Sequence, residues 1–194
     1  MPAAAKPRLT PGRVYRTKEF GRWGENPTRL AKRLTRDQGL VELRHGLYYR
    51  PKQSRFGAVP PDERELLRAF LEGSPFLFTG PDRWNSLGLG STAVFVDRLV
   101  YNTKRSGTFQ FGNRRFVLRR VRFPRDSTPE WFAVDLLENH EMAGVGLDEL
   151  GAGLERAVAS GRLRAKELLR AAGKYGTKRT QSVVRRALDR AMAE

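Results

Sequence analysis

The stretch NPTRLAKRLTRDQGLVELRHGLYYR, residues 26–50, decides the fold of this chain. Asn26 is a favoured helix N-cap residue, and Pro27 suits the first position inside a helix. Leu30 and Leu34 follow about one helical turn apart, so that both lie on the same side. This pattern predicts a short helix with one buried face.

The opposite face of this predicted helix is polar and strongly basic. Successive residues of a helix are rotated by about 100°. This rotation places five side chains away from the leucines: Thr28, Arg29, Lys32 and Arg36, with Arg33 on the flank. We interpret this face as one that reads duplex DNA. The alternative is an ordinary small α/β unit with a basic surface.

Short elements are predicted on both sides of this helix. RTKEFGRWG, residues 16–24, predicts another short helix with Phe20 and Trp23 buried. Residues 40–51, LVELRHGLYYRP, predict a β-hairpin, because Gly46 between two apolar runs tolerates the positive φ of a tight turn. Helix, turn, helix and hairpin in this order are typical of a winged helix-turn-helix, whose second helix enters the major groove.

Basic residues dominate the front of the chain. The 194 residues contain 37 Lys+Arg against 21 Asp+Glu, which gives a formal net charge of +16 and a pI near 11.1. Residues 1–55 alone contain 14 basic and 4 acidic residues. This excess predicts a polyanionic partner, with nucleic acid as the leading candidate. A second run at 160–190 has ten basic residues against Glu167 and Asp189, and a solubilising surface explains it equally well.

The composition excludes several classes of protein. There is no cysteine, which rules out a disulfide scaffold and any zinc module built on thiolates. No apolar run approaches the roughly 20 residues that span a bilayer, and the start MPAAAKPRLTPGR lacks the apolar core of a secretory signal. We therefore expect a soluble, cytoplasmic protein with no membrane partner. A hydrophobic content of 39% is enough for a folded core.

The pattern beyond the hairpin predicts a second domain. Periodicity is lost in PKQSRFGAVPPDE, residues 51–63, which predicts a linker. Alternation over residues 93–123 predicts a small antiparallel β meander, and residues 129–193 have the periodicity of helices. We expect an α+β fold in two parts: a winged helix-turn-helix domain at 1–55 and a mixed antitoxin or effector domain at 56–194.

The predicted meander carries two notable sets of side chains. Its alternation places the aromatic residues in the core rather than on a base-stacking platform: Phe95, Tyr101, Phe109, Phe111 and Phe116. Five arginines within nine residues exceed what one sheet face needs for solubility: Arg114, Arg115, Arg119, Arg120 and Arg122. These arginines suit a phosphate backbone or an acidic partner, and the sequence does not choose between the two.

Signatures of catalysis are sparse. The two histidines, His45 in the hairpin and His140 in a predicted helix, are far apart and form no paired metal site or catalytic triad by motif. Gly173-Lys174 lacks the upstream glycine of a phosphate-binding loop, since Leu168 stands there. No Asp or Glu precedes a Lys by two residues, the usual spacing in metal-dependent nucleases. We expect no enzyme activity, no metal and no cofactor, and a small nuclease is the least favoured alternative.

Three segments of the chain carry a family resemblance: GRVYRTKEF at 12–20, RLAKRLTRDQGLVELRHGLYYRP at 29–51, and TGPDRWNSLGLG at 79–90. They resemble the AbiEi family of antitoxins, described as winged-helix regulators of abortive-infection toxin–antitoxin operons of type IV. In that family the N-terminal domain binds inverted repeats in the operon's own promoter. The C-terminal domain neutralises a nucleotidyltransferase-like toxin. The resemblance thus implies an autorepressing antitoxin.

The resemblance also assigns DNA contact to particular residues. It maps contact by the second helix onto Thr28, Arg29, Lys32, Arg33 and Arg36, and wing contacts onto Arg44 and His45. The implied partners are double-stranded DNA, namely the protein's own promoter, and a nucleotidyltransferase-like toxin that is countered directly or through its effect. The alternative is a toxin-binding module that does not contact DNA.

Overall fold

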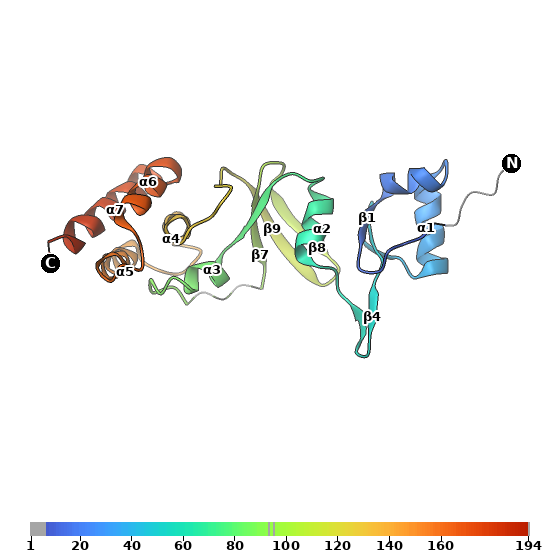
Figure 1. Ribbon diagram of the computed structural model, residues 1–194, viewed down its shortest axis with the longest axis horizontal. Helices are drawn as coiled ribbons and strands as arrows, with labels where there is room; N and C mark the ends of the chain where they lie inside the picture. Colours follow the sequence, from blue (N-terminus) through green and yellow to red (C-terminus); the bar gives the residue numbers. More distant parts are fainter. Residues whose placement is uncertain (1–6, 93, 95, 194) are drawn as a thin grey trace. The chain divides into compact units, whose positions relative to one another are not determined.

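The computed structural model describes residues 7–92, 94 and 96–193, and its mixed helices and strands confirm the expected α+β class (Figure 1). The first elements are β1 (Val14–Arg16), the 3-10 helix η1 (Thr17–Trp23), α1 (Pro27–Gln38), β2 (Val41–Arg44), β3 (Leu47–Tyr49), β4 (Lys52–Ser54), β5 (Gly57–Val59) and α2 (Glu63–Phe70). They are followed by β6 (Phe76–Thr79), α3 (Pro81–Asn85), β7 (Arg98–Asn102), β8 (Gly107–Phe111), β9 (Arg114–Arg120), α4 (Pro129–Glu138), α5 (Leu147–Ala159), α6 (Ala165–Tyr175) and α7 (Lys178–Ala191).

The described chain divides into two compact units, and their boundary differs from the expected division into 1–55 and 56–194. Unit 1 comprises the residues up to Pro75 together with Phe109–Arg114. Unit 2 comprises Phe76–Thr108 and the residues from Arg115 onward. Helix α2 and the turn between β8 and β9 therefore belong with the N-terminal elements.

Side-chain contacts explain why α2 belongs to unit 1. The backbone N–H of Val14 in β1 donates to Glu65 Oε1 of α2 over 3.0 Å. Phe70, at the end of α2, meets the rings of Phe109 and Phe111 edge-on, with centroids 4.9 and 4.8 Å away. These contacts join residues distant in sequence, so composition and periodicity did not indicate them.

The N-terminal elements of unit 1 form a small three-stranded antiparallel sheet beside two helices. The strand order is β1-β3-β2, and the turn between β2 and β3 contains Gly46 at φ 80°, as the predicted hairpin requires. The expected helix at 16–24 is present as the 3-10 helix η1. Its Phe20 is fully buried in a core with Tyr15, Leu34 and Tyr48, whereas Trp23 is half-buried.

The predicted linker at 51–63 is wrong, because most of this segment is structured. Lys52–Ser54 and Gly57–Val59 pair as the antiparallel hairpin β4–β5, and Asp62 then caps the N-terminus of α2. All six strand residues of the hairpin are exposed. The segment therefore lacks the apolar alternation by which a strand is normally predicted.

The expected antiparallel meander is also wrong in its topology. The sheet has the order β6-β7-β9-β8; β6 pairs with β7 antiparallel, but β7 and β9 run parallel. The buried side chain of Asn102 organises the turn after β7, since its Oδ1 accepts from the N–H groups of Lys104 and Arg105 over 2.8 Å. In the strand order β8 is at the sheet edge, and β9 lies between β7 and β8.

The aromatic residues expected in the meander core are mostly buried. Tyr101, Phe111 and Phe116 are buried and Phe109 is half-buried. Phe95 lies outside the described residues.

Helices α4 to α7, expected within residues 129–193, supply most of the core of unit 2, together with Trp84, Leu99 and Tyr101. Thr128 caps α4 and Pro129 occupies its first turn, after which α4 is buried on nearly all sides. The core continues through apolar residues of the following helices, including Leu150, Leu168 and Val184. Among the helices of the described residues, none is long and apolar enough to cross a membrane.

Candidate functional site

Helix α1 presents a set of exposed basic side chains on one face. This set, which we call the cationic face of α1, consists of Arg29, Lys32, Arg33 and Arg36, together with the neutral Thr28. All five side chains are exposed, as the helical spacing predicts. None of them forms an ion pair with another described residue, so their charges are available to a partner.

The opposite side of α1 anchors the helix in the core. Leu30, Ala31 and Leu34 are buried there. The Oδ1 of Asn26 accepts from the backbone N–H of Arg29 over 2.9 Å, which satisfies one free donor at the helix start. Gly39 ends the helix in the left-handed conformation at φ 61°. The cationic face therefore lies on a rigid, capped element.

An open groove of about 530 Å³ runs along the start of α1. Its lining combines the four basic side chains of the cationic face with Leu30 and with three residues around the turn between η1 and α1: Trp23, Gly24 and Asn26. The guanidinium of Arg22 lies over the Trp23 ring at 4.1 Å and also pairs with Glu19 at 3.6 Å. The groove thus combines basic side chains with one half-buried aromatic ring, which suits an anionic ligand.

The β2–β3 hairpin carries the two predicted wing residues. Arg44 and His45 are both exposed near its turn. The turn is tied to η1, because the N–H of Thr17 donates to the carbonyl of Gly46 over 3.1 Å. Arg44 is not wholly free, since its guanidinium lies 5.1 Å from the centre of the Phe109 ring.

The strand β3 beneath this turn holds two buried tyrosines. Burial raises the pKa of the Tyr48 hydroxyl, and the neighbouring carboxylate of Glu42 raises it further. Burial likewise raises the pKa of Tyr49. Both buried tyrosines therefore hold their hydroxyl protons more tightly than an exposed tyrosine does.

The arginines at β9 differ among themselves, because three of them have partners inside the protein. Arg114 pairs with Glu63 at 3.3 Å, and Arg115 Nε donates to Asp97 Oδ1 over 2.6 Å. Arg119 Nη1 donates to Asn139 Oδ1 over 2.6 Å. Arg120 and Arg122 are exposed. The predicted cluster is thus largely taken up by internal contacts.

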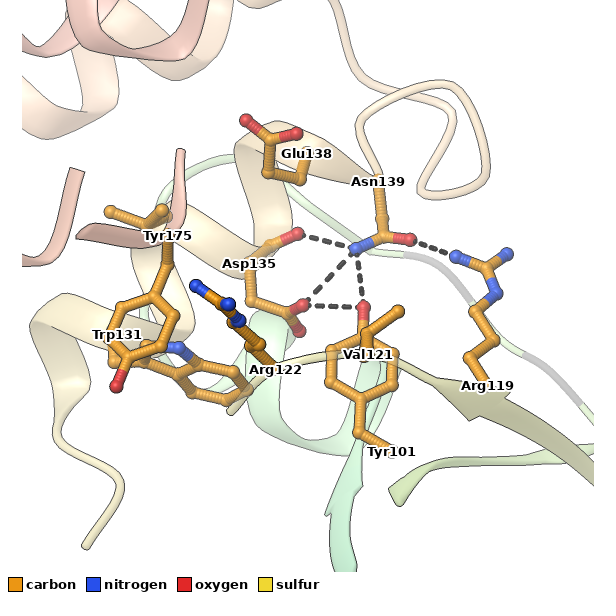
Figure 2. Close-up of a pocket in the computed structure, with 10 residues that line it drawn as sticks. Tyr101, Arg119, Val121, Arg122, Trp131, Asp135, Glu138, Asn139 and Tyr175 are labelled. Carbon is orange, nitrogen blue, oxygen red and sulfur yellow. Dashed lines mark hydrogen bonds between the residues drawn. The ribbon is translucent and has the colours of Figure 1, made fainter. Parts of the chain in front are cut away.

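Asn139 also belongs to a buried polar cluster in unit 2, which is centred on Asp135 of α4 (Figure 2). Asp135 Oδ2 accepts hydrogen bonds from Thr79 Oγ1 and from Trp84 Nε1, the latter over 2.8 Å. Asp135 Oδ1 accepts from Tyr101 OH over 2.7 Å and from Asn139 Nδ2 over 3.2 Å. Four donors from four different elements or turns therefore converge on one carboxylate.

This polar cluster has the electrostatics of a structural centre. Burial raises the pKa of Asp135, while hydrogen bonds from Thr79, Tyr101 and Trp84 partly oppose the shift. The pKa of Tyr101 is raised strongly by burial and by the charge of Asp135. Each of these donors is engaged with an acceptor inside the cluster, so we assign the cluster to the stability of unit 2. Sequence reasoning missed it, although an Asp inside the apolar run WFAVDLL was a usable signal.

A cavity of about 240 Å³ opens above the polar cluster. Trp131 and Tyr175 form its aromatic wall, with ring centroids 6.3 Å apart. Arg122 and Glu138 line it as well, and Glu138 Oε1 accepts from the N–H of Thr177 over 2.7 Å. The charges around this cavity are mixed, so it does not select a ligand of one sign.

Two further predicted features are His140 and the C-terminal basic run. His140 is half-buried, and its Nδ1 lies 3.3 Å from the carbonyl oxygen of Val145. Within residues 7–92, 94 and 96–193, no group of three or more His, Asp or Glu side chains is arranged to hold a metal ion. The C-terminal basic run is exposed on α6 and α7, where Arg190 pairs loosely with Glu155 at 3.9 Å.

Comparison with known proteins supports the fold and leaves the activity open. No family model matches the sequence, and no curated protein matches it significantly. The fold is similar to the crystal structure of the RV2827C protein from Mycobacterium tuberculosis, with a TM-score of 0.55 and 16% sequence identity. The match covers 98% of this chain and 80% of that chain. At this identity, the similarity demonstrates a shared architecture for nearly the whole chain and nothing further.

Proposed function

We propose that unit 1 binds duplex DNA through the cationic face of α1 and the β2–β3 hairpin. The observation that carries this proposal is the set of four basic side chains on one rigid helix face, none of which is paired with a described carboxylate. These positive charges are therefore not neutralised inside the protein and can attract phosphates. An α-helix also fits the width of the major groove of B-form DNA.

The proposed contacts divide into two kinds. Arginine and lysine contacts to phosphates set the position of the helix, and so do contacts from the hairpin turn at Arg44 and His45. In this proposal the exposed arginines of α1, among them Arg29 and Arg33, read guanine. Each bidentate arginine–guanine pair contributes about 1–3 kcal/mol of discrimination against the wrong base.

We further propose that the protein is an antitoxin that represses its own operon, as the resemblance to the AbiEi family implies. In this proposal unit 2 counteracts a nucleotidyltransferase-like toxin, directly or through its effect. The separate core of unit 2 supports a division of labour between the two units, because each has its own buried apolar cluster. Coexpression of the toxin reading frame with unit 2 variants tests this part of the proposal through cell growth.

The DNA-binding part is tested by salt dependence. The measurement is a gel-shift or anisotropy titration of the full chain with a duplex from the region directly upstream of its reading frame. Binding through six or more phosphates should weaken roughly a thousandfold between about 50 and 200 mM salt. Affinity that is absent at low salt, or that is insensitive to salt, would contradict the proposal and favour a toxin-binding module without DNA contact.

A further inference from the structure

The hairpin β4–β5 is an isolated element of unit 1 that projects away from the three-stranded sheet (Figure 1). Its six strand residues are exposed, so the hairpin buries no apolar face of its own. A lone two-stranded hairpin is only marginally stable in water. Its shape therefore depends on its attachment to the sheet and on its own turn.

The base of the hairpin is attached firmly to the rest of unit 1. Tyr49 OH of β3 donates to the carbonyl of Val59 at the end of β5 over 2.9 Å. The adjoining Arg50 is held on both sides: its N–H donates to the carbonyl of Arg13 over 3.0 Å, and its carbonyl accepts from the N–H of Gly12 over 2.6 Å. The hairpin is thus carried on the same sheet as the β2–β3 turn.

The turn of the hairpin holds one aromatic side chain outward. Ser54 Oγ accepts from the N–H of Phe56 over 3.1 Å and donates to the carbonyl of Gly57 over 3.0 Å. Gly57 adopts φ 100°, which closes the turn. Phe56 is 84% exposed, and the guanidinium of Arg55 lies 4.6 Å from the centre of its ring.

The positive charge of the hairpin is complementary to the negative charge of a polyanion. The segment from Arg50 to Val59 contains three cations, Arg50, Lys52 and Arg55, and no carboxylate. An anionic lipid surface would attract the same cations. However, one phenyl ring buries too little apolar area to hold a protein on a membrane, where even a single myristoyl chain binds only marginally.

We propose that Phe56 is a wedge that inserts between stacked base pairs from the minor groove, while Arg55 and Lys52 contact the flanking phosphates. This inference rests on the proposed DNA binding by α1 and adds a second contact with its own chemistry. Proteins that enter the minor groove commonly insert Phe or another apolar side chain, and the unstacked step kinks the duplex by about 20–90°. The expected ligand is thus duplex DNA that is bent where the hairpin contacts it.

The test compares the full chain with its F56A variant on one duplex of about 60 base pairs from upstream of its own reading frame. Affinity is measured by anisotropy, the bend by energy transfer between dyes at the two duplex ends, and unstacking by permanganate oxidation of thymines. Loss of one stacked ring should weaken binding roughly tenfold. It should also abolish both the bend and the reactive thymine.

Three further variants sharpen the comparison. F56L keeps an apolar wedge and should retain most of the bend. R55A should weaken binding and lower the slope of log affinity against log salt by about one, because one phosphate contact is lost. L169A is the control. Leu169 of α6 is an apolar residue that is 47% exposed, and its loss should change neither the affinity for the duplex nor the bend.

The outcomes separate this inference from the proposed function. If wild type binds the duplex and F56A binds and bends it equally well, the wedge is refuted while DNA binding by α1 stands. If wild type does not bind the duplex at any salt concentration, both ideas fail. Binding of wild type, but not F56A, to vesicles of phosphatidylserine and phosphatidylcholine in place of DNA would identify a membrane contact and overturn the wedge.

Discussion

The arginines of α1 and the arginines of β9 look alike in the sequence and differ in the structure. Those of α1 lie on an exposed face and form no ion pair with a described residue. On β9, Arg114 and Arg115 pair with Glu63 and Asp97, and Arg119 donates to the buried Asn139. The first group has its charge free for a ligand, whereas most of the second group stabilises the protein itself.

This difference shows that the density of basic residues is a poor guide to a binding site. A charge attracts a ligand when no opposite charge inside the protein already neutralises it. The decisive observation is therefore the set of neighbours of each guanidinium. The following predictions test whether the two groups of arginines really divide in this way, and whether the polar cluster behind Arg119 is structural.

The largest effect is expected for Asp135→Ala. The substitution removes the acceptor of four hydrogen bonds and leaves buried donors of Thr79, Trp84 and Tyr101 unpaired. We expect the free energy of unfolding to fall by about 3–5 kcal/mol. Urea unfolding of the full chain, followed by circular dichroism, measures the loss. Asp82→Ala is the control, because Asp82 has an exposed side chain and should cost less than about 1 kcal/mol.

The second prediction concerns DNA affinity. Arg29→Ala combined with Lys32→Ala should weaken binding to the upstream duplex by at least a hundredfold, because two contacts of the cationic face are lost. The fold should survive, since both side chains are exposed. The matched double variant Arg114→Ala with Arg115→Ala removes the same total charge from β9 and should stay within about threefold of wild type. Equal losses in the two double variants, measured by titration at one salt concentration, would erase the distinction between α1 and β9.

The third prediction concerns stability, for which an arginine of β9 should matter more than an arginine of α1. Arg119→Ala removes the donor to Asn139 Oδ1 and leaves that buried oxygen unpaired. The free energy of unfolding should fall by about 1–3 kcal/mol. Arg36→Ala, on the cationic face, should change it by less than about 0.5 kcal/mol. Thermal unfolding of the two variants measures both changes in stability. A larger loss of stability for Arg36→Ala than for Arg119→Ala would contradict the prediction.

The smallest effect is a dependence on pH at the start of α4. Glu130 is buried, and its Oε1 accepts from the N–H and the Nε of Arg164 over 3.1 Å each, while Oε2 has no hydrogen-bond partner among the described residues. Burial alone raises the pKa of Glu130, but hydrogen bonds outweigh it, those from Arg164 first and those from the Glu130 backbone and Thr128 after them, and lower the pKa below its ordinary value of 4.5. A lowered pKa in the folded state stabilises the protein above pH 4.5, and this contribution disappears as the pH falls through the folded value.

Glu130→Gln tests this linkage. At about pH 7 the variant should be less stable than wild type by about 1 kcal/mol, since a charged acceptor is replaced by a neutral amide. At about pH 3 the difference should be smaller, because Glu130 of the unfolded chain is protonated below its ordinary pKa of 4.5 and the contribution of its lowered folded-state pKa decreases. Urea unfolding at the two pH values gives both differences. A gap that is constant with pH would mean that the charge of Glu130 contributes nothing to stability.

Much of unit 1 was predictable because its signals are local. Asn26, Pro27 and the repeat of Leu30 with Leu34 specify α1 within one short window, and the hairpin at Gly46 needs only a turn residue between two apolar runs. The exposure of the cationic face follows from helical periodicity alone. The hairpin β4–β5 was missed for the opposite reason, since its strands bury nothing and show no alternation.

The sheet of unit 2 was less predictable because its pairing is not local. Alternation identifies strands but does not choose their neighbours, so it did not indicate the parallel pairing of β7 with β9. The boundary between the units depends on contacts of α2 with β1 and of Phe70 with Phe109 and Phe111. Such contacts join residues far apart in the chain.

The sequence by itself therefore determined the α+β class, the basic character, and which side chains of α1 face outward, because these properties depend on composition and on the geometry of one helix. Only the tertiary structure decided which arginines are free. A guanidinium is neutralised by whichever carboxylate or amide folding brings beside it, and those partners stand 18 residues away for Arg115 and 20 for Arg119. The structure also shows that Phe56 is an exposed side chain on an isolated hairpin, in a segment where the sequence had indicated a linker.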